Sequence, residues 1–374
     1  MANDKTGTIE SICESTLEYL RRNQDLKAGE YYGAIWSEKA YHGPLLDYHA
    51  GGSHHHRGAG SAGLVFWRTG RRKRDRDLMH RAEWVFDWLA ARQRAGGGYQ
   101  EIQNNEKPSD WEGTGLEECS TIETAFVAHG LGHALLEGLP PKKSYADCLQ
   151  GIGHWLLSME RPAGSGMFPH HDRSPYDCLN ANLHAAESLI LAYWALKKVY
   201  GRTISIFFAG AKRAVLHTLA LQWPNGCFPY LSSGGVTINY TSLVMWCLDN
   251  LWSVLPPDLR SALVAPAMIG KAGQKASAFL RSCVGPGGAL LWDKNETSSA
   301  KFNVWTYAIT FAVLMSIGGR DNLAAAKKIL HRLAALRTKS GLLPMKDRGG
   351  EITECAFMQA DIMLFLQSGS SNTK

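Results

Sequence analysis

A short motif built on glycine recurs along this chain of 374 residues and constrains its fold more than any other feature. Each copy has a glycine, then within one to four positions an aromatic or large apolar residue, and often a proline. The copies lie at 97–99, 166–169, 226–229, 288–292 and 341–344, at intervals of roughly 55 to 70 residues. Self-similarity at such an interval indicates a repeated supersecondary unit.

Helical periodicity on both sides of each motif shows what the unit is. Amphipathic segments, with apolar residues three and four apart, precede the motifs, and more apolar segments follow them. We predict outer helices over 6–24, 75–95, 142–160, 203–221, 259–283 and 321–337. We predict inner helices over 55–67, 116–137, 175–199, 236–253, 300–317 and 351–367. The expected fold is all-α: one (α/α)6 toroid of six helical hairpins over 1–367, with a disordered tail over 368–374.

The predicted connections are unequal in length. Those from an inner helix to the next outer helix are mostly short, whereas those from an outer to an inner helix are long and carry the glycine motifs. Long loops in a compact domain are often functional. In a toroid they share one face with the N-termini of the inner helices, whose dipoles favour anions. We therefore expect a polar cleft on that face.

This layout resembles the α/α-toroid superfamily of six-hairpin glycosidases, polysaccharide lyases and uronyl hydrolases. The resemblance covers nearly the whole chain, is one of architecture, and points to no single family. Terpene cyclases and protein prenyltransferases share the toroid. The Asp-x-Asp-Asp and Asp-Asp-x-x-Asp motifs of terpene cyclases are absent, as is the Cys-His-Gly zinc signature of lanthionine cyclases.

Polar residues at the starts of the predicted inner helices suggest lyase chemistry. β-Elimination from a uronate needs a group that neutralises the carboxylate, a base for the C5 proton and an acid for the leaving oxygen. We predict a polysaccharide lyase acting on an acidic, uronate-containing glycan, with Tyr240 and His184 transferring protons. Asn182 and His56 or Arg57 are predicted to hold the carboxylate. In lyases of this superfamily such Tyr, His and Asn sets are usual.

Other polar and aromatic side chains near these helix starts and on the long loops are candidates for substrate binding. Aromatic rings form platforms for sugars, and cations suit acidic groups. Tyr41, Tyr99, Tyr230 and Trp292 are further aromatic candidates, and of these Tyr99 and Trp292, which belong to the recurring motif, are as compatible with core packing as with this role. Each histidine is as compatible with a buried core position. The predicted binding set is His55, Arg57, Trp36, Trp111, Asp177, Asn180, Arg173, Asn239, Lys301, Asn303, Trp305 and Glu354.

Three other functions remain open. A glycoside hydrolase needs two carboxyl groups roughly 5–10 Å apart, and Glu118 with Asp177 on neighbouring inner helices is a possible pair. Ser174 and Asp177 also match a helix-capping signal. A glycan-binding protein without catalysis is a second alternative. An isoprenoid-type cyclase is a third, which the polar helix starts disfavour.

Two histidine groups have metal-ligand spacing. His129 and His133 are i, i+4, but no glutamate follows His129, and the glycines at 130 and 132 indicate close helix packing. His54, His55 and His56 are consecutive, so that at most two can point together on a helix. We therefore predict no metal and no cofactor.

Charge and cysteine usage exclude some classes of partner. Much of the net charge of +6 lies in residues 71–74, which we interpret as a solvated loop and first helical turn, offset by Asp75 and Asp77. We therefore predict no nucleic-acid partner. The eight scattered cysteines suggest reduced core thiols. No signal peptide or long apolar run is visible, so we predict a cytoplasmic protein that does not bind membranes. The oligomeric state is left open.

Overall fold

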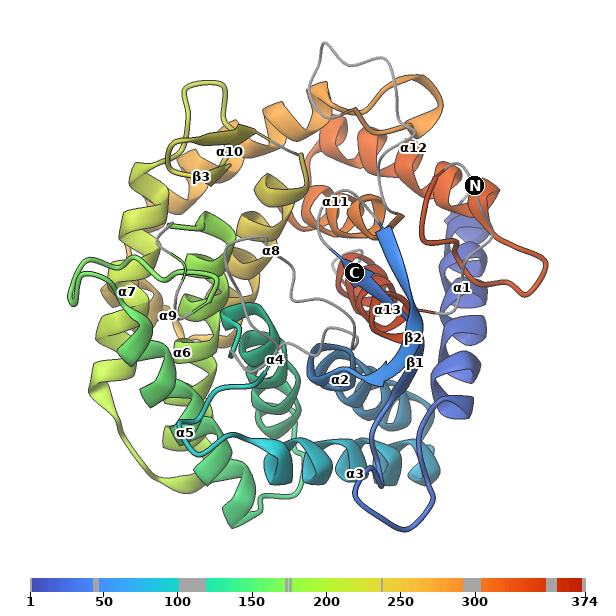
Figure 1. Cartoon of the computed structure of the whole chain (residues 1–374). Helices are drawn as coiled ribbons and strands as arrows, with labels where there is room; N and C mark the ends of the chain where they lie inside the picture. The colour runs from blue at the N-terminus through green and yellow to red at the C-terminus, as the bar shows by residue number, and fades with distance from the viewer. Residues whose placement is uncertain are drawn as a thin grey trace.

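Two concentric rings of helices make up the molecule (Figure 1). The computed structural model describes residues 2–42, 47–100, 119–171, 174, 177–236, 238–291, 304–347 and 355–371. The inner ring consists of α2 (His56–Lys73), α4 (Thr121–Leu136), α6 (Leu179–Tyr200), α8 (Ile238–Val254), α11 (Val304–Ile317) and α13 (Ala356–Ser371). The outer ring consists of α1 (Ala2–Arg22), α3 (Arg76–Arg92), α5 (Lys143–Met159), α7 (Ser205–Ala220), α10 (Pro266–Ser282) and α12 (Arg320–Leu336). Each inner helix contacts the next and α13 contacts α2, so the inner ring is closed.

The two rings differ in burial in the way their sequences predicted. Every residue of α4 from Thr121 to Leu135 is buried, because the helix is covered on all sides. The outer helix α3 buries one face only, including Leu78, Val85 and Leu89, and exposes its charged residues. The predicted all-α toroid of helical hairpins is therefore confirmed.

Several predicted boundaries change. The predicted helix 259–283 is divided into α9 (Pro257–Leu263) and α10, because Pro266 disfavours a helical conformation at the residue before it. The prediction that Ser174 and Asp177 cap the third inner helix is wrong. The helix α6 begins at Leu179, after Cys178 pairs in extended conformation with Leu231. At the other end of the chain, α13 extends to Ser371, into the tail that we expected to be disordered.

The recurring glycines are the joints between neighbouring units. Gly33, Gly97, Gly166, Gly226, Gly288 and Gly341 all have φ between +80° and +98°. A Cβ on any of them would lie only 2.1–2.4 Å from an atom of an outer helix. In chain order the atoms met are the carbonyl oxygens of Trp84, Gly151, Arg213, Lys275 and Lys328, and finally Ser15 Oγ. Only glycine fits such a joint, and the last one connects the end of the chain to α1.

The joint at Gly33 is a sixth copy of the motif, which the sequence analysis did not recognise. Gly33 is followed by Ala34 and by the buried Ile35, which occupies the place that Tyr99 has in the next copy. Because Ile35 is not aromatic and no proline follows, the pattern is weaker here.

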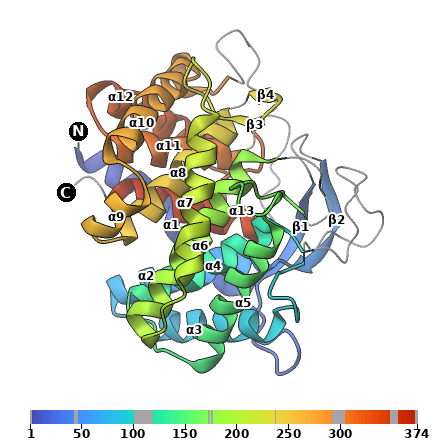
Figure 2. The same ribbon diagram turned by 90° about the vertical axis from the view of Figure 1, so that its left-hand side faces the viewer.

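The described parts of the long connections lie at one end of the toroid, as predicted (Figure 2). The hairpin of β1 (Trp36–His42) and β2 (Asp47–His54) lies at this end, with the smaller hairpin of β3 (Pro229–Leu231) and β4 (Gly234–Val236). Both chain termini lie at the opposite end. The inner helices begin at the hairpin end, so the starts of these helices converge beneath the hairpins.

The basic run is helical rather than a loop. Residues 71–73 form the last turn of α2, Arg74 has left-handed backbone geometry, and Asp75 accepts a hydrogen bond from the backbone N–H of Leu78 to cap α3. Cations at a helix C-terminus are favourable, which explains the run without a nucleic-acid partner.

The cysteines match their predicted state. All eight are free thiols, and seven of them are buried. Within the described ranges, none of the helices is both long and apolar enough to cross a bilayer.

Candidate active site

Side chains at the starts of the inner helices fall into two groups. The first group fixes the loops that carry the joint glycines. In each case a side chain forms a hydrogen bond with the backbone of the large residue that follows a joint glycine. Thr124 accepts from Tyr99 N (2.9 Å), Asn182 from Phe168 N (2.5 Å), Thr241 from Phe228 N (3.0 Å) and Tyr307 from Leu290 N (3.1 Å), and Gln359 donates to Leu343 O (2.7 Å). We call Thr124, Asn182, Thr241, Tyr307 and Gln359 the junction side chains. Asn182, predicted to hold a carboxylate, thus uses its oxygen to fix a loop.

Two of the three consecutive histidines face the same way, since the rings of His54 and His56 both lie near Trp88, at 6.3 and 5.3 Å between centroids. His54 ends β2 and His56 begins α2, so the three do not share a helix. His54 stacks on Tyr31, with ring centroids 4.3 Å apart, and His55 lies 5.1 Å from Phe357. His56, predicted to be catalytic, lies between Trp88 and Tyr99 and contacts the carbonyl of Gln100 at 3.1 Å. Burial lowers the pKa of His55 to about 3 and that of His56 to about 4, so both are neutral.

The second group surrounds Arg57, at the centre of the inner ring. The backbone N–H of Arg57 donates to Glu123 Oε2 at 2.8 Å, and its side-chain Nε and Nη2 donate to Asp361 Oδ2 at 3.0 and 2.6 Å. The guanidinium carbon lies 4.3 Å from the ring centroid of Phe126, 5.3 Å from that of Phe357 and 5.5 Å from that of Trp305. These partners belong to α4, α11 and α13, so four inner helices meet at one side chain.

Asp361 is the fully buried anchor of this group. Ser61 donates to its Oδ1 at 2.5 Å, and Trp305 Nε1 donates to its Oδ2 at 3.0 Å. Burial raises the pKa of Asp361, and the charge of Arg57 opposes that shift. The carboxylate thus holds the guanidinium in one orientation between the aromatic rings. Trp305, predicted to bind substrate, supports this arrangement.

Two histidines complete the group. His184 on α6 lies 5.2 Å from Phe126, the ring that also faces Arg57, and its Nδ1 contacts Cys247 Sγ at 3.4 Å. His170 belongs to the loop after the 166–169 motif, where its carbonyl accepts from Thr121 N at 2.8 Å. Burial lowers the pKa of both, to about 3 for His184, and the nearby charge of Arg57 acts in the same direction. Among the described residues, neither His184 Nε2 nor His170 Nδ1 has a hydrogen-bond partner.

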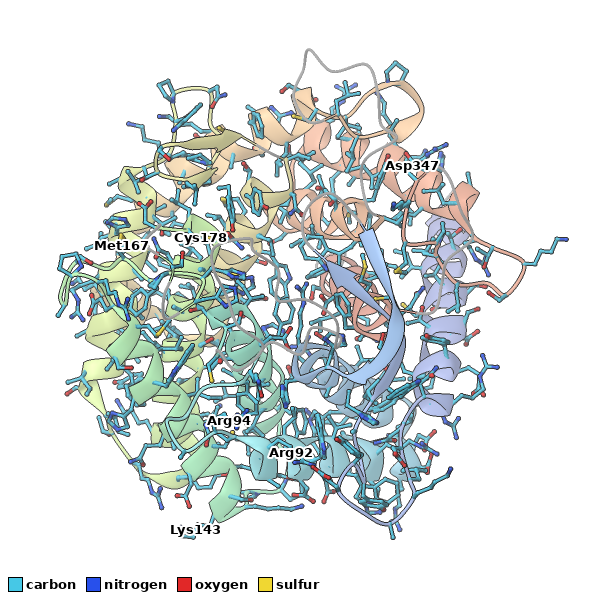
Figure 3. All side chains as sticks on the ribbon, viewed as in Figure 1. Arg92, Arg94, Lys143, Met167, Cys178 and Asp347 are labelled. Atoms are coloured by element: carbon cyan, nitrogen blue, oxygen red, sulfur yellow. The ribbon has the colours of Figure 1, made fainter. Side chains whose placement is uncertain are left out.

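We call Arg57, Glu123, His170, His184 and Asp361, with the rings of Phe126, Trp305 and Phe357, the central cluster. In Figure 3 Met167 lies nearer the outer ring, and Cys178, at the start of α6, lies further in. The cluster combines a fixed guanidinium, neutral imidazoles with an available nitrogen, and aromatic walls, and these groups can polarise an oxygen and accept a proton.

Other predicted residues lie outside the central cluster. Asp177 accepts from Ser232 Oγ at 2.6 Å and so supports the turn of the β3–β4 hairpin. Asn180 accepts from the Cys178 thiol at 2.7 Å. Asn239 Oδ1 accepts from Thr306 Oγ1 at 3.3 Å, which joins the starts of α8 and α11.

Two predicted aromatic residues lie near the hairpin end. Tyr240 packs on Tyr230, with ring centroids 4.4 Å apart. Trp36 is 38% exposed beside a pocket of about 590 Å³ lined by residues 22–27 and His54. Tyr99, in contrast, is fully buried, and its hydroxyl donates to Leu89 O at 2.7 Å, so it fills the core.

Six predicted site residues lie outside the described residues, and their roles stay predictions. They are Trp111, Glu118, Arg173, Lys301, Asn303 and Glu354.

The sequence alone did not point to Asp361, Phe126 or His170 as site residues. His170 carried a usable signal, because it directly follows the Pro169 that ends a recurring motif. No signal in the sequence marked Asp361, because its partner Arg57 is 304 residues away in the chain.

Comparison with known proteins supports the fold and leaves the family open. No protein-family model matches the chain, and no curated protein has a significantly similar sequence. A solved structure of a D-mannose isomerase superposes with a TM-score of 0.70 at 13% identity, covering 96% of this chain and 97% of the other. A cellobiose 2-epimerase from Bacillus thermoamylovorans B4167 gives 0.68 at 11% identity, covering 98% and 100%. An unsaturated glucuronyl hydrolase specific for heparin gives 0.65 at 11% identity, covering 98% and 97%.

These similarities establish the α/α-toroid shared with such carbohydrate-active enzymes, as the layout of the sequence predicted. At identities of 11–14% they concern the fold alone.

Proposed function

We propose that this chain is a carbohydrate-active enzyme that transfers a proton at a sugar carbon next to a carbonyl group, as in sugar isomerisation or epimerisation. The observation that carries this proposal is the central cluster, where the fixed guanidinium of Arg57 and the neutral His184 both lie against the ring of Phe126. His170 lies within electrostatic range of both residues. The names of two similar structures, a D-mannose isomerase and a cellobiose 2-epimerase, support the same class of reaction.

The histidines have the state that a proton acceptor needs. An imidazole accepts a proton only when it is neutral, and burial keeps the pKa of His170 and His184 below the ordinary value. In the proposed reaction His170 Nδ1 takes the proton from the carbon next to the carbonyl. The guanidinium of Arg57 donates to the carbonyl oxygen, on which negative charge develops. Return of the proton to the former carbonyl carbon, with the hydroxyl proton passing from one oxygen to the other, gives the isomer. Return of the proton to the original carbon from the other face gives the epimer.

The charge of the central cluster favours a neutral sugar over a uronate. Asp361 balances the charge of Arg57, and the carboxylate of Glu123 lies at the backbone of the same residue. The described residues of the central cluster therefore offer no surplus positive charge for a substrate carboxylate. This leads us to place the predicted acidic substrate second.

β-Elimination from a uronate-containing glycan is the second candidate. It needs the same proton abstraction next to a polarised carbon, and the pair of Tyr230 and Tyr240 supplies a phenol for the leaving oxygen. Arg173 and Lys301, outside the described residues, are the predicted cations for such a substrate.

Hydrolysis by paired carboxylates has the weakest support within the described ranges. Both oxygens of Asp361 accept hydrogen bonds, and its side chain is fully buried. Asp177 is bound to Ser232 instead. Neither is positioned as an available acid or base opposite Glu123.

Solvent deuterium tests the proposal. The protein is incubated in D2O with a panel of aldoses, ketoses and β-linked disaccharides, and the products are followed by NMR. We expect deuterium at the carbon next to the carbonyl, together with an isomer or epimer. His170→Gln should abolish the exchange, whereas His80→Gln, on the exposed side of α3, should not.

The same protein is assayed with polyuronates for the ultraviolet absorbance of an unsaturated product. That product without deuterium exchange in the neutral sugars would select the lyase. Neither signal with any substrate, or exchange unaffected by His170→Gln, would contradict the proposal.

A further inference from the structure

A second group of ionisable side chains lies on α4 and α6, away from the helix starts. His129 and His133 come from α4 and Glu187 comes from α6, and their exposures are 3%, 5% and 2%. His129 Nδ1 lies 2.6 Å from Glu187 Oε1, and His133 Nε2 lies 3.9 Å from the same oxygen. The three potential ligand atoms all lie within 4.8 Å of one another. Two imidazoles and a carboxylate thus converge in the interior.

We propose that His129 Nδ1, His133 Nε2 and Glu187 bind a divalent metal ion of the zinc type. Two histidines and one glutamate form a known zinc ligand set, and zinc bonds to nitrogen and oxygen at about 2.0–2.2 Å. An ion among the three atoms would separate the His129 nitrogen and the Glu187 oxygen by roughly 1 Å and draw His133 inward, movements within the reach of side-chain rotations. The site is independent of the proposed sugar reaction.

The unpaired nitrogens of this group support the assignment. Among the described residues, His133 Nε2 has no hydrogen-bond partner, although its atom is buried. A buried polar atom without a partner is costly, and so is a buried carboxylate that has no cation beside it, even though the side chains of His129, His133, Cys247 and Asn250 surround Glu187. A bound cation would give His133 Nε2 a bond and would compensate the charge of Glu187.

A second carboxylate is placed to orient one ligand. His133 Nδ1 lies 4.0 Å from Glu137 Oε1, and Arg68 holds that carboxylate with hydrogen bonds of 3.0 and 2.6 Å. Metal-binding histidines usually direct their other ring nitrogen to such an acceptor, which fixes the tautomer. This arrangement selects Nε2 of His133 as the nitrogen that faces Glu187.

Close helix packing and metal binding are compatible here. A Cβ on Gly130 would lie 2.2 Å from the carbonyl oxygen of Gly60, and one on Gly132 would lie 2.9 Å from Leu191 Cβ. The glycines therefore pack α4 closely against α2 and α6, as their small size predicted. The same approach to α6 brings Glu187 to the histidine pair. Glu187 would be the third ligand, supplied by another helix. The glutamate beside the first histidine of H-E-x-x-H is a general base and not a ligand, so its absence here does not argue against a metal.

Glu187 also belongs to a triad with His184 and Cys247, which would give a site containing sulfur. We assign the ion to the two histidines of α4 because the Cys247 thiol already contacts His184 Nδ1 at 3.4 Å. The two sites are distinguishable, since a thiolate bound to cobalt has a charge-transfer band that nitrogen and oxygen ligands lack.

The test uses the full-length chain, first stripped with a chelator. Zinc is added back and measured by elemental analysis after dialysis, and the melting temperature is recorded with and without it. We expect one zinc per chain and a higher melting temperature with zinc. His133→Gln and Glu187→Gln should each lose both effects. The control His154→Gln, on the exposed side of α5, should keep both.

Cobalt replaces zinc to identify the ligands. We expect the visible bands of a four-coordinate cobalt ion without a thiolate band, and no change in Cys247→Ser. A thiolate band that disappears in Cys247→Ser would overturn the assignment. Failure of the stripped chain to bind zinc would also overturn it, as would full binding by both ligand variants. If a variant does not fold, judged by circular dichroism, the cobalt spectrum of the unmodified chain still decides.

Discussion

The junction side chains and the central cluster, apart from His170 on its loop, lie near the starts of the inner helices, yet the two groups differ in what they bind. Asn182 and His184 show this on one helix. The oxygen of Asn182 accepts from the backbone of Phe168, whereas His184 faces Phe126 and keeps its Nε2 unpaired within the described part of the chain. Junction side chains are uncharged and satisfy loop backbone, whereas the central cluster consists of charged and titratable groups that hold one another.

The comparison separates stability from activity. A junction side chain completes a hydrogen bond that exists without substrate, so its loss should destabilise the fold. A histidine with an unpaired nitrogen contributes little to the fold through that nitrogen, so its loss should affect turnover. Residue type alone does not distinguish the two groups.

The largest effect is expected from Arg57→Met, which removes the centre of the cluster. It leaves Asp361 buried and unpaired, and losing one partner of a buried ion pair costs about 3–5 kcal/mol in the free energy of unfolding. Activity should be lost as well. Urea unfolding measures the first effect. The double change Arg57→Met with Asp361→Leu should recover stability but not activity. A loss below about 1 kcal/mol for the single change would mean that Asp361 does not depend on Arg57.

His170→Gln should affect turnover and spare the fold. Removing a general base typically costs about 10²–10⁴-fold in rate. The free energy of unfolding should change by less than about 1 kcal/mol, because the ring nitrogen Nδ1 has no partner to lose. The matched variant is His56→Gln, whose ring packs between Trp88 and Tyr99. It should lower stability and keep kcat. If His56→Gln instead lowered kcat and spared stability, while His170→Gln did the opposite, His56 would be the catalytic residue, as the sequence predicted.

Gly97→Ala tests the loop joints. Its φ of +98° strains any other residue, and the added Cβ would lie 2.2 Å from the carbonyl oxygen of Gly151. Backbone strain and overpacking each cost about 1–3 kcal/mol, so the expected loss is about 3 kcal/mol or more. Gly138→Ala is the control, since its φ is +97° and no atom lies within 4 Å of the added Cβ. Equal losses in thermal unfolding would show that the close approach to α5 contributes nothing.

Asn182→Ala should lower stability by about 1–3 kcal/mol, because the buried N–H of Phe168 loses its acceptor. Thr241→Val removes the equivalent acceptor for Phe228 and should give a similar loss. The kcat of both variants should stay within about twofold of the unmodified chain, a difference of less than 0.5 kcal/mol. A large fall in kcat for Asn182→Ala, without one for Thr241→Val, would show that Asn182 acts in catalysis together with the central cluster.

Lowering the pH should reduce the free energy of unfolding through the central cluster. It should not affect the hydrogen bonds of the junction side chains. The pKa of His184 is about 3 in the folded chain, against 6.5 ordinarily. Between these values the unfolded chain binds more protons, so stability is complete above about pH 6.5 and falls as the pH drops. The slope for one such histidine is about 1.4 kcal/mol per pH unit. Urea midpoints from pH 7 to 4 measure it, and His184→Gln should reduce the slope. An unchanged slope would place the acid sensitivity elsewhere, for example at His55.

The sequence by itself determined the ring. Six outer helices with one apolar face, inner helices that are apolar nearly all round, and glycines at regular intervals leave few other ways to bury the apolar surface. It also predicted where the long loops gather, because helix order and loop length set that without knowledge of any contact. These properties are local, since they depend on residues within a few turns of one another.

Only the tertiary structure decided which polar side chains work together. Helical periodicity assigns a side chain to a face, but the groups it meets come from other helices. Arg57 meets Asp361, 304 residues further along the chain, and His129 meets Glu187 on the neighbouring helix. The start of α6 at Leu179 likewise depends on the pairing of Cys178 with Leu231. Hydrogen bonds and charge pairs act over a few ångströms in space, whereas the periodicity in a sequence records distance only along the chain.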